Sequence, residues 1–121
     1  MPQETETNAR PHDVRQGDVY LRAIPRVDPA GQPVPLDHGR VILAYGEATG
    51  HAHAVVAVDD VETIMPPALL VEAPDGRRVL YVTAPCVLVH QEHARIALAP
   101  GCYEVYRQRQ YFPDAVRPIE D

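Results

Sequence analysis

Short segments rich in Val, Ile, Leu and Tyr recur along the whole chain, and this recurrence is the feature that most constrains the fold. Residues with turn-forming tendency separate the segments, and no stretch shows the 3.6-residue period of an amphipathic helix. The pattern therefore predicts an all-β protein. The eight expected strands are Asp18–Ile24, Arg40–Tyr45, His53–Val58, Ala68–Glu72, Arg78–Thr83, Cys86–His90, Arg95–Leu98 and Cys102–Tyr111.

The turns between these segments support the same prediction. Turn sequences occur at residues 28–31, 37–39, 74–76 and 100–101. Pro25–Pro35 contains four prolines and a glycine, which favours an extended loop between the first two strands. Eight strands at this spacing predict a small single-domain β-barrel or two-sheet sandwich, with a cupin-like jelly roll as one form of it.

The length of 121 residues fits one domain with one core. Residues 1–13 lack apolar periodicity and are expected to form a flexible N-terminal arm, so the single β domain is predicted to span residues 14–121. Cys86 and Cys102 are too few for a disulfide framework. We expect both to be reduced core residues.

Charge and hydropathy exclude several classes of function. The formal net charge of -6 repels phosphate backbones, so nucleic acid is not an expected partner. All basic residues are arginine, which excludes a lysine nucleophile. No apolar run is long enough to span a bilayer, and the polar opening Met1–Arg10 is unlike a secretory signal. We therefore expect a cytoplasmic protein with no membrane partner.

Four of the six histidines fall in two tight clusters, His51-Ala52-His53 and His90-Gln91-Glu92-His93. Residues two apart on a strand point to the same face, so His51 and His53 can both face one ion. His90 and His93 are three apart and converge only if Gln91 and Glu92 form a turn or bulge. His12 lies in the arm and His38 in a turn, so both are expected to be solvated bystanders.

Three or four imidazoles are enough protein ligands to bind zinc, iron, nickel or manganese. The sequence thus predicts a divalent transition-metal site with His51, His53, His90 and His93 as ligands. Glu92 or Glu47 is the candidate for a carboxylate ligand, an orienting group or a general base. The alternative is a pH-sensitive polar patch in which the histidines bond to carboxylates and backbone.

Two resemblances accompany these residues. The histidine pair on a strand, with further histidines later in the chain, resembles the cupin superfamily, and this resemblance implies a β-barrel around a divalent metal. The segments Gln16–Val19, Gly46–His53 and His90–His93, with the closing QRQYFPDAVRPIED, resemble a group of small uncharacterised bacterial and phage proteins. That second resemblance implies no activity, but it favours interpreting the two histidine clusters as one unit.

The leading hypothesis is a compact metal-binding domain. Whether it is an enzyme stays open; an open coordination position would take water, oxygen or a small oxyacid as its small-molecule ligand. The alternative is a non-catalytic interaction or assembly module from a phage or accessory operon, which meets a partner through its strand edges and has an exposed, metal-free histidine cluster. A third hypothesis is a metal sensor or carrier, and homo-oligomers are compatible with each of these.

Overall fold

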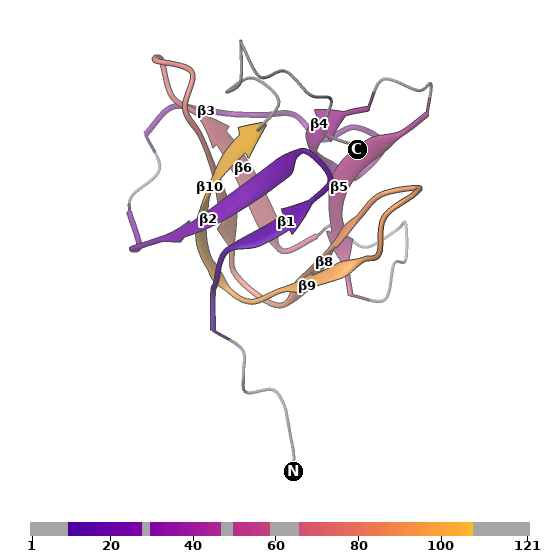
Figure 1. Ribbon diagram of the computed structural model, residues 1–121. Helices are drawn as coiled ribbons and strands as arrows, with labels where there is room; N and C mark the ends of the chain where they lie inside the picture. Colours follow the sequence, from indigo (N-terminus) through magenta and orange to yellow (C-terminus); the bar gives the residue numbers. More distant parts are fainter. Residues whose placement is uncertain (1–9, 28–29, 47–49, 59–65, 108–121) are drawn as a thin grey trace, which may run out of the picture.

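The computed structural model describes residues 10–27, 30–46, 50–58 and 66–107, and within these ranges every regular element is a β-strand (Figure 1). Ten strands form two antiparallel sheets, one of six strands and one of four. The all-β prediction is confirmed, and the two-sheet arrangement matches a small sandwich or barrel-like domain. The described ranges contain no helix of the length and hydrophobicity needed to cross a membrane.

The six-stranded sheet has the order β1-β2-β10-β7-β6-β3. Its strands are β1 (Val14–Gln16), β2 (Val19–Ile24), β3 (Gln32–Pro33), β6 (Ala68–Glu72), β7 (Arg78–Val82) and β10 (Gly101–Arg107). The four-stranded sheet has the order β4-β5-β8-β9. Its strands are β4 (Val41–Tyr45), β5 (Ala52–Ala57), β8 (Cys86–Val89) and β9 (Ile96–Leu98).

All eight predicted strands are present, and their ends agree to within one residue, except that the predicted end at Tyr111 lies outside the described residues. Two strands were missed. β1 pairs with β2 across a two-residue turn, Gly17-Asp18, and Gly17 has a φ of 60°. β3 lies inside the predicted extended loop Pro25–Pro35. There Gln32–Pro33 pairs with β6, at an edge position where a strand tolerates proline.

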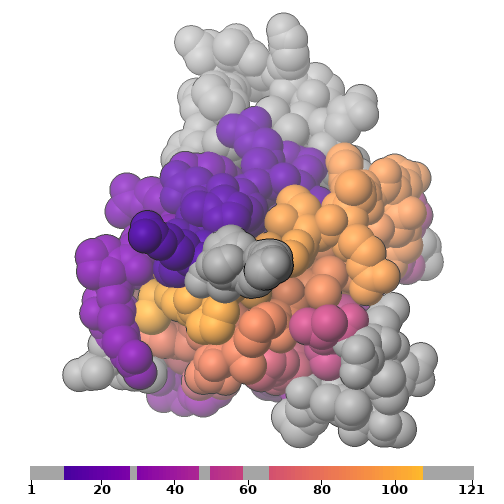
Figure 2. Space-filling model, turned by 90° about the horizontal axis from the view of Figure 1, so that it is seen from below, coloured from indigo at the N-terminus to yellow at the C-terminus, as the bar shows by residue number. Residues whose placement is uncertain are grey.

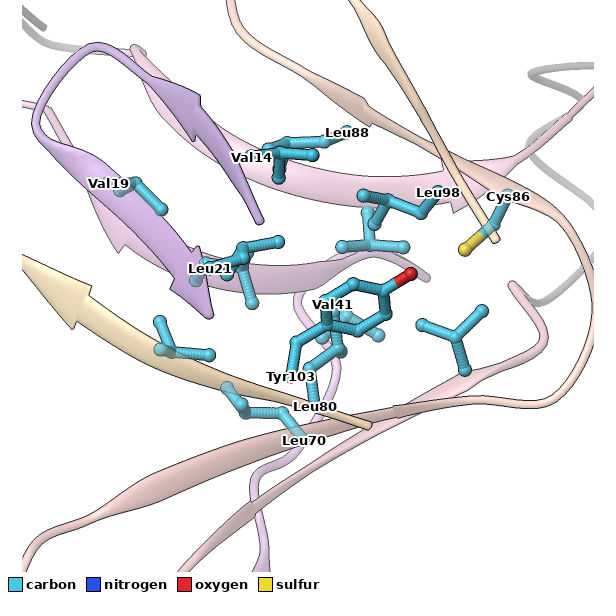
Figure 3. Packing of buried hydrophobic residues seen from close by; sticks show 14 of the residues in the cluster. Val14, Val19, Leu21, Val41, Leu70, Leu80, Cys86, Leu88, Leu98 and Tyr103 are labelled. Carbon is cyan, nitrogen blue, oxygen red and sulfur yellow. The ribbon is translucent and has the colours of Figure 1, made fainter. Parts of the chain in front are cut away.

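The main core lies between the two sheets. Tyr103 of β10 is its largest fully buried side chain, and Figure 3 shows its ring among Leu21, Leu80, Leu98 and other aliphatic side chains from both sheets. The Tyr103 hydroxyl donates a hydrogen bond to the carbonyl of Ala99. The remaining members of this apolar core are Val14, Val19, Val41, Leu43, Ala44, Val55, Leu70, Val82, Cys86, Leu88 and Val105.

The cysteine prediction is confirmed, because Cys86 and Cys102 are both free and buried. Burial raises the pKa of the Cys86 thiol to about 12, so the reactive thiolate is scarce at neutral pH.

The segment before β1 contacts the domain at two points. Asp13 accepts hydrogen bonds from the Tyr20 hydroxyl (2.6 Å) and the backbone N–H of Ala23 (2.9 Å). Pro11 lies directly on Gly101, where an added Cβ would come within 2.8 Å of the proline ring. Figure 2 shows the indigo N-terminal region beside the orange and yellow residues near β10. Pro11 and Asp13 of the predicted arm therefore touch the domain, and residues 1–9 lie outside the described ranges.

β4 is an edge strand of the four-stranded sheet and carries an irregularity. Its register with β5 shifts between Ile42 and Ala44, which leaves Leu43 as the extra residue of a bulge. A guanidinium nitrogen of Arg78, from β7 of the other sheet, donates a hydrogen bond of 2.7 Å to the Leu43 carbonyl. This bond links the two sheets.

Candidate functional site

The register of the four-stranded sheet places His53 opposite His90. β5 and β8 pair Val55 with Leu88 and Ala54 with Val89, so the next pair in the ladder is His53 with His90. Val55 and Leu88 face the main core, and side chains two residues apart share a face. Both imidazoles therefore continue the inward rows of their strands, and their ring centroids are 4.2 Å apart.

The predicted turn at His90–His93 is confirmed. β8 ends at Val89, residues 91–93 form a bend, and β9 begins at Ile96. The bend returns the His93 ring to 4.7 Å from His90 and 6.0 Å from His53. His51 joins the cluster through a ring contact of 5.6 Å with His90. The structure thus brings together all four histidines that the sequence singled out.

His51 lies directly before the strand that holds His53, because β5 begins at Ala52. The cluster has an inner and an outer side. His53 is fully buried and His90 is 8% exposed, whereas His51 and His93 are partly exposed. On the outer side the Glu92 carboxylate lies 3.8 Å from Nδ1 of His51. Glu47, the other predicted carboxylate, lies outside the described residues.

Gln16 of β1 fixes the orientation and tautomer of His53. The Gln16 amide nitrogen donates to the carbonyls of Leu88 (3.2 Å) and Ala94 (2.9 Å), so its oxygen must be the acceptor for Nδ1 of His53 at 2.9 Å. Nδ1 of His53 therefore carries a proton. In the neutral ring Nε2 then presents a lone pair.

Nε2 of His53 faces a buried carboxylate. Nε2 of His53 lies 3.4 Å from Oδ1 of Asp18, and neither side chain is exposed. The other oxygen of Asp18 accepts two hydrogen bonds from the guanidinium of Arg107, at 2.9 and 3.2 Å. A neutral imidazole nitrogen and a carboxylate oxygen are both acceptors. A proton or a metal cation at this point converts their repulsion into attraction.

His90 is oriented differently. The backbone N–H of Glu92 donates to Nδ1 of His90 at 3.0 Å, so the neutral ring holds its proton on Nε2. In this orientation Nε2 is a donor rather than a metal ligand. Nε2 of His93 is buried and makes no hydrogen bond within the described part of the chain.

Ring spacing separates this arrangement from a formed metal centre. Two imidazoles on one tetrahedral ion have centroids about 5 Å apart, given metal–nitrogen bonds of about 2.1 Å. The His53–His90 pair is packed more tightly than this, at 4.2 Å. Accordingly, no three His, Cys, Asp or Glu side chains of the described ranges have the arrangement of a metal-binding group.

Three residues of the site were missed by sequence reasoning: Gln16, Asp18 and Arg107. The available signal was Gly17-Asp18, a two-residue hairpin turn between the short apolar segments at Val14 and Val19. The two predicted bystanders, His12 and His38, are exposed; Nδ1 of His38 bonds to Asp37 at 2.6 Å.

Comparison with known proteins gives a family without an assigned activity. No curated protein and no solved structure matches the chain. One family model does match, over residues 15–108, and it is described as a domain of unknown function, DUF8820. The match includes the described residues of both histidine clusters together with Gln16, Asp18 and Arg107. The chain therefore belongs to the DUF8820 family.

Proposed function

We propose that this chain is a cytoplasmic protein that binds one divalent transition-metal ion, such as zinc, iron, nickel or manganese, at the cluster of His51, His53, His90 and His93. The observation that carries the proposal is the state of His53. Gln16 accepts from its Nδ1–H, and its Nε2 lies 3.4 Å from a buried carboxylate oxygen. Metal-binding histidines are held in the same way, because they donate their second ring N–H to a fixed acceptor.

Binding requires one rearrangement. His90 must give up its bond from the Glu92 N–H and turn, so that an unprotonated nitrogen faces the ion. The same turn separates His90 from His53 and brings their spacing to that of two ligands. Residues 91–93 form a bend rather than a strand, so this adjustment disrupts no sheet hydrogen bonds.

The burial of His53 and His90 favours this proposal over an interaction module, which calls for an exposed histidine cluster. If a coordination position stays open, it would take water, oxygen or a small oxyacid. Glu92, which is exposed beside His51, is then the candidate acid–base group, and Glu47 is the second.

The test uses protein purified without a polyhistidine tag. Elemental analysis and calorimetric titration with zinc, nickel, iron(II) and manganese should find about one ion per chain for at least one metal. The paired variant His51→Ala/His53→Ala should abolish binding, because it removes two ligands. Replacing His12 and His38 together with alanine is the matched control, and metal affinity should stay within about threefold, or roughly 0.7 kcal/mol. No uptake of any of the four metals would contradict the proposal.

A further inference from the structure

We infer that the carboxylate of Asp18 is a ligand of the same metal ion, so that the inner donor set is one carboxylate oxygen with imidazole nitrogens rather than imidazoles alone. The inference rests on the proposed function. It gives the ion a side chain that follows β1 by two residues and lies far in sequence from both histidine clusters.

The distance between His53 and Asp18 carries the inference. Nε2 of His53 and Oδ1 of Asp18 are 3.4 Å apart, which is longer than a good charged hydrogen bond of about 2.8 Å. Two donor atoms about 2.1 Å from one tetrahedral ion lie about 3.4 Å apart. The pair therefore already has the spacing of two neighbouring ligands.

The partners of both groups direct these two atoms toward one point. Arg107 occupies Oδ2 of Asp18 with two hydrogen bonds, and Gln16 occupies Nδ1 of His53. What faces inward is Oδ1 on one side and Nε2 on the other, and both atoms are buried. Nε2 of His93 is buried as well and lies on the neighbouring ring. Arg107 is thus a positioning residue, because it holds the carboxylate without facing the ion.

Charge gives a second argument. A divalent ion among neutral imidazoles would place two positive charges beside the Arg107 guanidinium in a buried region. The Asp18 carboxylate offsets one of them. A carboxylate oxygen also sets the metal class, since oxygen and imidazole donors suit zinc, iron(II) and manganese(II) better than a soft ion such as copper(I).

The decisive variant is Asp18→Asn. Its amide oxygen can accept from Arg107 and its amide N–H can donate to Nε2 of His53, so the metal-free domain should melt close to the wild type. Affinity for zinc, measured by competition with a chromophoric chelator, should fall at least about a hundredfold because a ligand is lost and the His53 lone pair is occupied. The matched control is Asp75→Asn, the same carboxylate-to-amide change in the exposed turn between β6 and β7, which should stay within about threefold.

A cobalt(II) titration separates ligation from positioning. Asp18→Asn should change the position of the cobalt d–d bands in whatever complex still forms. Arg107→Gln should weaken cobalt binding about tenfold, with no further loss when combined with Asp18→Asn, because Arg107 acts only through that carboxylate. Additive losses would show that the two residues do not act on one ligand.

The outcomes distinguish the two proposals. Wild-type protein that takes up no metal overturns the proposed function. Wild-type protein that binds metal, with Asp18→Asn equal to it within threefold, overturns this inference alone. If Asp18→Asn does not fold, infrared difference spectra of wild type with and without zinc, on protein carrying ¹³C-labelled aspartate, decide the matter. A shifted carboxylate band supports ligation and an unchanged spectrum overturns it.

Discussion

The space between the two sheets has two unlike ends. At one end Tyr103 is surrounded by aliphatic side chains from both sheets, and at the other Gln16, Asp18, His53 and His90 are buried together. The same backbone rule produces both. Inward positions two residues apart run from Val55 to His53 on β5, and from Leu88 on β8 to His90 directly after it. The change from an apolar to a polar interior therefore needs only a different residue at the end of each strand.

The two ends are stabilised by different kinds of interaction. Apolar packing is non-directional and tolerates modest changes of shape, provided that volume is kept. The polar end depends on each partner, because a buried polar group that loses its partner costs more than the bond contributed. We therefore expect conservative substitutions to be tolerated at the Tyr103 end. At the Asp18 end we expect damage from any substitution that leaves a buried polar group without its partner.

The largest expected effect is at the apolar end. Tyr103→Ala should lower the free energy of unfolding by about 3–5 kcal/mol, because it leaves a cavity between the sheets. Tyr103→Phe keeps the ring and removes only the hydrogen bond to Ala99, so it should cost about 1 kcal/mol. Urea unfolding of both variants measures the difference. Equal losses would mean that the hydroxyl, and not the packing, dominates at this end.

The next effect is at the polar end. Arg107→Met should lower the free energy of unfolding by about 3 kcal/mol, because the fully buried Asp18 carboxylate loses its guanidinium partner. Adding Asp18→Asn removes the buried charge, so the double variant should be more stable than Arg107→Met alone. Chemical denaturation of the metal-free proteins tests this. A double variant less stable than Arg107→Met would contradict the contrast between the two ends.

Substitution of Gln16 should change stability less, but it should have a specific NMR signature. Gln16→Leu deprives His53 of its acceptor and two carbonyls of their donor, and should cost about 2 kcal/mol. The wild type should show a slowly exchanging imidazole N–H proton by NMR, and the variant should lack it. A persistent N–H signal in the variant would show that Gln16 does not set the tautomer of His53.

The smallest effect lies at the surface, before β1. Hydrogen bonds from Tyr20 and Ala23 hold the pKa of Asp13 below its ordinary value of 3.8. A lowered pKa in the folded state stabilises the protein above the unfolded value, and this contribution is lost as pH falls through the folded pKa. The melting temperature of wild type should therefore exceed that of Asp13→Asn at pH 7, with the gap narrowing as pH falls below the ordinary value of 3.8. A gap that does not change with pH would exclude ionisation of Asp13 as its source.

The sequence is informative where the signal is local. Val-rich and Leu-rich runs between turns are enough to locate eight strands, and the spacing of His90 and His93 predicts the bend that separates them. β1 and β3 were missed because three and two residues are too short to show a period. Assignment of each strand to a sheet depends on pairing between distant segments, which no local pattern encodes.

The same distinction between local patterns and long-range contacts applies to the residues of the site. The histidines could be found because a tight cluster of an uncommon residue stands out in any sequence. Asp18 could not, because an aspartate after glycine is an ordinary turn residue that is usually exposed, and only the packing of the β1–β2 hairpin buries it. Arg107 and Gln16 become significant only through contacts with residues more than 35 positions away.

The bond between Arg78 and the Leu43 carbonyl has a consequence for how the protein behaves in concentrated solution. An edge strand offers its backbone groups to any extended chain that approaches, and this is the usual start of aggregation. On β4 the bulge at Leu43 interrupts the regular spacing of those groups, and the guanidinium already occupies one carbonyl. An extended segment of another molecule would meet irregularly spaced backbone groups along this edge, and one of the carbonyls would already be hydrogen-bonded. The domain can therefore keep an apolar strand at the margin of a sheet without recruiting further strands there.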